Sequence, residues 1–215
     1  MLDLRKVKCV IIDFDGTMYS DADWSTCDDF TFQYLVENGI YTKSRQEFLA
    51  ENKFPSTYHF TQCIYAYLRK RKLDTSAYAR FENERIHNFL CARIRKINPK
   101  LVEALCNKYP VFLLSDSSPN YILHYLDNFR INKYWFAGLI SNDFSSYDLS
   151  KVPFMAEIVR NGGYNPQEVI MIGDSYNHDI VPAKKLGIQS AHVKDVSDTE
   201  FVIRNLLSVW LWVVI

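Results

Sequence analysis

The sequence lacks the cysteine spacings that indicate a zinc site or a disulfide framework. Its five cysteines are widely separated, and no two of them form a Cys-x-x-Cys pair. They are typical of small apolar core residues in a reducing compartment, so we expect a cytoplasmic protein. The first residues, Met1-Leu2-Asp3-Leu4-Arg5, do not have the pattern of a secretory signal peptide.

Net charge is also absent, because 25 Lys and Arg balance 25 Asp and Glu. This argues against a dedicated nucleic-acid binder, which usually has a basic domain. Short basic runs at residues 69–72 and 93–96 are interpreted as solvated helix ends, or alternatively as contacts to an anionic substrate. The one membrane-like stretch, residues 206–215, is too short to span a bilayer as a helix. It indicates a packed terminal element or a subunit contact, so we expect no membrane partner and either a monomer or a homodimer.

Short apolar runs alternate with helical patterns along much of the chain. The 215 residues, 48% of them hydrophobic, suffice for one large domain or a domain with an insert, and no internal repeat or low-complexity linker divides them. Strands alternating with helices predict an α/β fold with a parallel sheet. The predicted strands are residues 8–12, 111–114, 137–140, 169–172 and 188–193, and the predicted helices are residues 98–108, 120–129, 152–160 and 175–186.

Residues 18–97 have a different pattern, rich in helical signals and without clear strand alternation. A helix is predicted to end near Gly39, and Ser44 with Glu47 forms a capping box for the next one. Two more helical patterns follow at residues 56–68 and 78–90. We therefore predict two domains: a core of residues 1–17 and 98–215, and an all-helical insert of residues 18–97.

Two apolar runs far apart in the sequence end abruptly at aspartate. Residues 10–12 lead to Asp13-Phe14-Asp15-Gly16-Thr17, and residues 169–172 lead to Gly173-Asp174-Ser175, with Asp179 following. Such runs are typical of interior parallel strands, whose carboxyl ends carry ligand sites. Two carboxylates about 4 Å apart repel by roughly 4 kcal/mol at an effective dielectric constant of about 20. A cation is therefore expected among them, and oxygen ligands favour Mg²⁺.

Paired aspartates beside Mg²⁺ suit phosphoryl transfer. Asp13 and Asp15 can project to the same side of a strand, so one can attack phosphorus while the other moves protons. Proton transfer alone accelerates a reaction only about 10²- to 10⁴-fold, so ligands for the metal and the phosphate are needed as well. The candidates for holding phosphate are Gly16, Thr17, Ser115 and Lys151.

The order of these motifs resembles the haloacid dehalogenase-like hydrolase superfamily. Its four motifs are matched by residues 13–17, by the strand of residues 111–114 ending in Ser115, by Lys151 two residues before Pro153, and by residues 173–179. The resemblance covers essentially the whole chain. It implies a Rossmann-like three-layer core and makes the insert of residues 18–97 a helical cap.

The resemblance also implies roles for individual residues. Asp13 would be the nucleophile that forms an aspartyl-phosphate, and Asp15 the general acid and base, which lends its main-chain carbonyl to Mg²⁺. Asp174 would be a direct metal ligand, and Asp179 a ligand, a water-mediated ligand or an orienting acid. Ser115 and Lys151 would hold the phosphoryl group. Asp116 stands where the family often has Asn and is a further candidate for contacting the substrate.

The main hypothesis is a Mg²⁺-dependent phosphatase that acts on a small phosphorylated metabolite. A phosphotransferase such as a sugar-phosphate mutase could use the same intermediate, and a binding protein with a retained but inactive site is a third reading. A carbon–halogen hydrolase is disfavoured, because it needs no acid at the position of Asp15. Candidate substrate-selecting residues of the insert are Arg45, Tyr58, His59 and Arg69, while His87 and His178 are interpreted as surface or packing residues.

Overall fold

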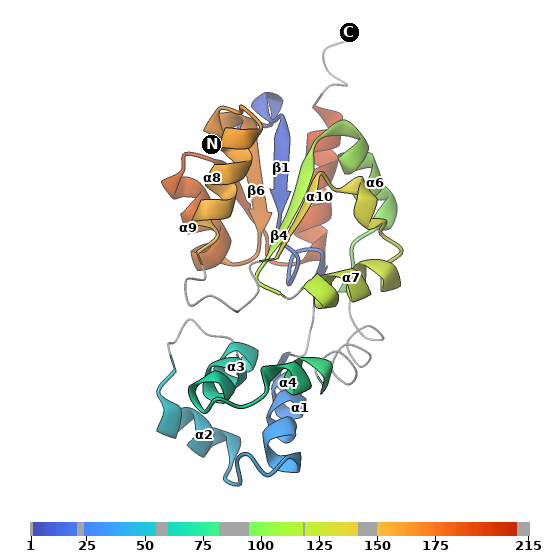
Figure 1. Cartoon of the computed structure of the whole chain (residues 1–215). Coiled ribbons are helices and arrows are strands. Elements are labelled where there is room, and N and C mark those ends of the chain that lie inside the picture. Colours follow the sequence, from blue (N-terminus) through green and yellow to red (C-terminus); the bar gives the residue numbers. More distant parts are fainter. Residues whose placement is uncertain are drawn as a thin grey trace. The chain divides into compact units, whose positions relative to one another are not determined.

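A computed structural model of the chain describes residues 2–20, 24–54, 60–81, 95–117, 119–141 and 150–209 (Figure 1). The chain divides into two compact units, one of residues 1–20 and 94–215 and one of residues 21–93. The short strands β2 (Tyr19–Ser20) and β3 (Arg95–Lys96) pair antiparallel in the first unit. The prediction of helix throughout residues 18–97 is wrong at these positions, because two-residue strands have no alternation to recognise.

The first unit is built on a five-stranded parallel sheet with the strand order β5-β4-β1-β6-β7. The strands are β1 (Cys9–Ile12), β4 (Val111–Ser115), β5 (Gly138–Ser141), β6 (Val169–Gly173) and β7 (Gln189–His192). All five were predicted, with each end correct to within one residue. The chain passes from β1 to β4 and β5 on one side, and then to β6 and β7 on the other. The order in which the chain adds strands therefore reverses between β1 and β6, and open α/β sheets bind ligands at such a point.

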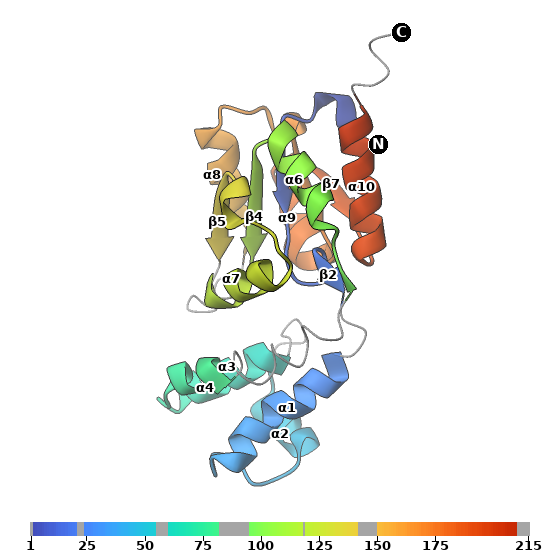
Figure 2. The same ribbon diagram turned by 90° about the vertical axis from the view of Figure 1, so that its right-hand side faces the viewer.

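Helices cover both faces of this sheet (Figures 1 and 2). They are α6 (Pro99–Lys108), α8 (Val152–Asn161), α9 (Val181–Lys185) and α10 (Val196–Ser208), with 3₁₀ turns at Leu4–Lys6, Lys133–Trp135 and Pro166–Glu168. Helix α7 (Pro119–Asn128) lies at the carboxyl ends of β4 and β5 (Figure 2). On one face, Met155 and Ile158 of α8 and Ala183 of α9 form a buried cluster with Ile11 and Met171 of the sheet. Helices α6 and α10 pack together on the other face. The predicted three-layer α/β fold is thus confirmed.

One helical prediction in this unit needs correction, and one helix was not predicted. The single helix predicted for residues 175–186 is a π-helical turn, Tyr176–Ile180, followed by α9. Pro182 has no N–H to continue an α-helical hydrogen-bond ladder, and the N–H of Val181 instead donates five residues back to Tyr176. Helix α10 was not predicted as such, although Asp195 caps it by accepting from the N–H groups of Ser197 and Asp198. Residues 210–215 lie outside the described part.

The second unit is helical in its described residues. Its helices are α1 (Trp24–Glu37), α2 (Arg45–Asn52), α3 (Phe60–Lys70) and α4 (Thr75–Phe81). The predicted capping box at Ser44 and Glu47 is confirmed. The unit has its own core, in which Leu35, Phe48 and Ile64 are completely buried. In neither unit do the described residues form a helix long and apolar enough to cross a membrane.

Candidate active site

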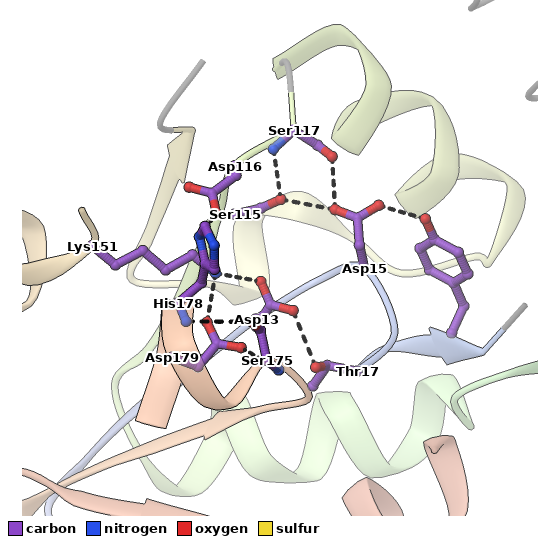
Figure 3. Close-up of polar contacts among 11 residues, drawn as sticks. Asp13, Asp15, Thr17, Ser115, Asp116, Ser117, Lys151, Ser175, His178 and Asp179 are labelled. Carbon is purple, nitrogen blue, oxygen red and sulfur yellow. Dashed lines mark hydrogen bonds and ion pairs between the residues drawn. The ribbon is translucent and has the colours of Figure 1, made fainter. Parts of the chain in front are cut away.

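The polar residues predicted from the sequence meet at the carboxyl ends of the three central strands (Figure 3). Asp13 follows β1, Ser115 ends β4, and Asp174 follows β6. The strand register places Ile12 beside both Leu113 and Ile172, so the polar residues beyond these positions converge. Because the residues of these strands are buried and apolar, the strands fix the aspartates that follow them at one edge of the sheet.

Lys151 lies between two buried aspartates. Its Nζ is 2.7 Å from Oδ1 of Asp13 and 2.7 Å from Oδ1 of Asp179. The lysine side chain is 2% exposed and those of the aspartates are 6% and 0% exposed, so water screens these ion pairs little. Thr17 donates its hydroxyl to Oδ2 of Asp13 at 3.1 Å, and the N–H of Ser175 donates to Oδ2 of Asp179.

The acidic residues outnumber the positive charge available in this cluster. Burial raises the pKa of Asp13 well above its usual range, and the neighbouring carboxylates raise it further, while Lys151 opposes them. Burial and Asp179 raise the pKa of Asp174 to about 6. For Lys151, burial favours the neutral form, but Asp13 and Asp179 outweigh it and raise the pKa of the ammonium, which stays charged. Additional positive charge would therefore stabilise the site.

The geometry and the donor set fit a small divalent cation. Asp13, Asp174 and Asp179 each offer a carboxylate oxygen, and these three oxygens lie within 4.8 Å of one another. Hard oxygen ligands favour Mg²⁺. The carboxylate of Asp174 also lies close over Gly16, where an added Cβ would be 2.2 Å from its Oδ2. A cation among these carboxylates would lower the pKa values that burial and mutual repulsion raise.

Replacing Gly16 with alanine is expected to displace Asp174 and weaken Mg²⁺ binding. Gly16 has a φ of +74°, so alanine there also costs about 1–2 kcal/mol of backbone strain. Gly163 is the matched control, because its φ is +64° but an added Cβ would meet nothing within 4 Å. Urea unfolding should show a loss from backbone strain in both variants, and a larger one in Gly16→Ala because Asp174 must also move, whereas calorimetry should show weaker Mg²⁺ binding only for Gly16→Ala. Equal Mg²⁺ affinity in the two variants would contradict this interpretation.

Among the described residues, Asp15 accepts hydrogen bonds from hydroxyl groups and forms no ion pair (Figure 3). Ser115 and Ser117 donate to its Oδ2 at 3.1 and 2.7 Å, and Tyr19 donates to its Oδ1. Ser115, predicted as a phosphate ligand, is thus within reach of Asp15 in the structure. Ser117 and Tyr19 were missed by the sequence analysis. The position of Ser117, just beyond a strand ending at the site, was a usable signal, whereas nothing in the local sequence pattern marks Tyr19.

Asp116 faces His178, which comes from the π-helical turn after β6. Oδ2 of Asp116 is 3.6 Å from Nδ1 of His178, and both side chains are partly buried. The neighbouring carboxylate of Asp116 raises the pKa of His178 above its usual value, because it favours the charged imidazolium. His178 therefore lies at the edge of the site, and the interpretation of this residue as a plain surface or packing group omits its contact with Asp116.

The candidates in the helical unit have more ordinary surroundings. Arg45 forms ion pairs with Asp28 and Asp29 at 2.9 and 2.6 Å, and its guanidinium lies over Phe60. Arg69 lies over the ring of Tyr65. Tyr58, His59 and His87 lie outside the described residues. Substrate-selecting roles for this set stay predictions.

Solved structures with the same fold come from several microorganisms. A haloacid dehalogenase-like phosphatase from Thermococcus onnurineus is 18% identical, with a TM-score of 0.64 over 94% of this chain and 98% of that one. A family enzyme from Bacteroides thetaiotaomicron, solved with magnesium and inorganic phosphate, is 17% identical, with a TM-score of 0.56 over 87% and 94% of the two chains. A 2-haloacid dehalogenase from Pseudomonas syringae is 14% identical, with a TM-score of 0.58 over 95% and 99%.

These likenesses show a Rossmann-like α/β fold that is shared by a phosphatase and by a 2-haloacid dehalogenase. A search of curated protein sequences finds no significant match. A family model for haloacid dehalogenase-like hydrolases matches residues 7–187. The chain therefore belongs to the haloacid dehalogenase-like hydrolase family, which confirms the resemblance predicted from its motifs.

Proposed function

We propose that the protein is a Mg²⁺-dependent phosphatase that cleaves a small phosphate monoester through an aspartyl-phosphate. The observation that carries this proposal is the division of work between two neighbouring carboxylates. Asp13 is hydrogen-bonded to a buried ammonium, which can also offset the charge of a phosphate. Asp15 is held by three hydroxyl donors and forms no ion pair among the described residues, so it can carry and exchange a proton. A dehalogenase has no use for the second group, because a halide leaves without a proton.

The chemistry proceeds in two displacements. An oxygen of Asp13 bonds to phosphorus while the bond from phosphorus to the leaving oxygen breaks. The electron pair of that bond goes to the leaving oxygen, which takes the proton of Asp15. Asp15, now a carboxylate, then takes a proton from water as the water oxygen bonds to phosphorus and the bond to Asp13 breaks. Phosphate is released, Asp13 is restored, and Asp15 is protonated for the next cycle.

The other site residues bind and orient the phosphoryl group. Lys151 offsets charge on Asp13 and phosphate, and its bond to Asp179 holds it in place. Ser115, the N–H groups near Gly16 and Thr17, and the groups around Asp116 would contact phosphate oxygens. Asp13, Asp174 and the main-chain carbonyl of Asp15 would hold Mg²⁺, with Asp179 serving as a ligand or an orienting acid. When bound, Mg²⁺ supplies positive charge that offsets the phosphate and carboxylate charges.

A phosphate-release assay with phenyl phosphate tests this proposal. The protein should release inorganic phosphate with Mg²⁺ and lose that activity in EDTA, with recovery on adding Mg²⁺ in excess. A sugar-phosphate mutase would instead interconvert phospho-sugar isomers with little phosphate release, and a dehalogenase would release halide from a 2-haloacid. If no phosphate is released from phenyl phosphate or from a panel of phosphorylated metabolites, the proposal is wrong. The predicted role of the helical unit as a substrate-selecting cap belongs to the same proposal.

A further inference from the structure

Asp15 has a different set of donors on each of its two oxygens. Oδ2 accepts from both Ser115 and Ser117, whereas Oδ1 accepts from Tyr19 alone among the described residues. A carboxylate oxygen can accept two hydrogen bonds. Oδ1 therefore has one lone pair that no described residue contacts. This lone pair can carry the proton that Asp15 gives to the leaving group. Among the described residues, Tyr19 is the hydrogen-bond donor to this oxygen.

The Tyr19 hydroxyl is itself oriented by a second tyrosine. The hydroxyls of Tyr19 and Tyr121 are hydrogen-bonded to each other. A phenol has a single proton to donate. Because Tyr19 uses its proton for the Asp15 carboxylate, Tyr121 is the donor in the tyrosine pair. The result is a directed chain from Tyr121 to Tyr19 to Asp15.

Buried packing holds the Tyr19 ring in place. Tyr19 is 0% exposed. Its ring stacks on Tyr125 with centroids 5.1 Å apart and meets the edge of Phe14 at 5.4 Å. Its backbone pairs with Lys96 in the ribbon of β2 and β3. A side chain fixed by both ring packing and backbone pairing can hold its hydrogen-bond partner in one orientation.

We propose that Tyr19 is a positioning residue that aims Asp15 at the leaving oxygen, with Tyr121 orienting the Tyr19 hydroxyl. This inference rests on the proposed phosphatase function. When Asp15 gives its proton to the leaving oxygen, it becomes a carboxylate, and the Tyr19 hydrogen bond stabilises that charged form. The donor therefore favours proton transfer as well as fixing its direction. The Tyr19 hydrogen bond matters most when the leaving oxygen is basic, and least when the leaving group departs readily as an anion.

The test is a series of ring-substituted phenyl phosphates, from phenyl phosphate to 4-nitrophenyl phosphate, with Mg²⁺ present. For Tyr19→Phe, kcat/KM with phenyl phosphate should fall about 10- to 100-fold, the effect of losing one hydrogen bond to a charged group. With 4-nitrophenyl phosphate the fall should be less than about threefold, because 4-nitrophenolate needs little protonation. The plot of log kcat/KM against leaving-group pKa should thus become steeper in the variant.

Tyr125→Phe is the matched control, because it also removes a buried phenol hydroxyl from the ring cluster, and no hydrogen bond links Tyr125 to Asp15 among the described contacts. Its slope should equal that of the unmodified protein. An unchanged slope in Tyr19→Phe, or an equal fall for every phenyl phosphate in the series, would overturn the inference and leave the phosphatase function standing. Failure of the unmodified protein to release phosphate would instead overturn the proposed function itself.

Discussion

Replacing Asp13 with asparagine is expected to lower phosphatase turnover by about 10⁴-fold or more, the order of loss seen when a nucleophile is removed. Asn has no carboxylate to form the aspartyl-phosphate, and its amide is a poor nucleophile. Lys151 and Thr17, which contact Asp13, can still bind phosphate in this variant, but they cannot form the covalent intermediate. Phosphate release at saturating phenyl phosphate and Mg²⁺ measures the loss.

Two further measurements make this result specific to the nucleophile. Asp127→Asn removes an exposed carboxylate of α7 and should retain full turnover. Rapid acid quenching after mixing with ³²P-labelled substrate should trap label on the unmodified protein and none on Asp13→Asn. Activity in Asp13→Asn comparable to that of Asp127→Asn, or label trapped equally in both variants, would contradict the assignment.

The features that could be predicted from sequence are those set by residues next to one another in the chain. The runs ending at Asp13 and Asp174 identify buried parallel strands, and parallel strands bring their carboxyl ends together whatever their order. The convergence of Asp13, Ser115 and Asp174 therefore follows from local patterns. The order of the strands around β1 was not predicted, because alternating strands and helices are compatible with several orders.

The contacts that were missed depend on turn geometry or on distant packing. Tyr19 reaches Asp15 only because the chain turns back after Gly16 and pairs Tyr19 with Lys96, far away in the sequence. Lys151 was expected to neutralise the nucleophile, and it pairs with Asp13, but its second ion pair, with Asp179, was not predicted because it needs the packing of α8 against the sheet. A lysine before a helix is too common to predict a buried ion pair. Such contacts require the three-dimensional arrangement.

Replacing Lys151 with methionine is expected to destabilise the protein strongly when no divalent cation is present. Methionine fills a similar volume but leaves the buried carboxylates of Asp13 and Asp179 without their shared cation. Removing one partner of a buried ion pair typically costs about 3–5 kcal/mol, because the remaining charge is uncompensated. Urea unfolding in EDTA should show this loss. Lys185→Met, at an exposed position of α9, is the control and should change stability by less than about 0.5 kcal/mol.

Adding Mg²⁺ separates the structural role of Lys151 from its role in catalysis. A cation bound by Asp13 and Asp174 replaces part of the missing positive charge, so Mg²⁺ should stabilise Lys151→Met more than it stabilises Lys185→Met. Phosphate release should nevertheless stay low in Lys151→Met, because no ammonium then contacts the nucleophile and the phosphoryl group. If Lys151→Met in EDTA is as stable as Lys185→Met, the buried lysine is not offsetting the acidic cluster. If Mg²⁺ restores turnover along with stability, Lys151 acts only through folding.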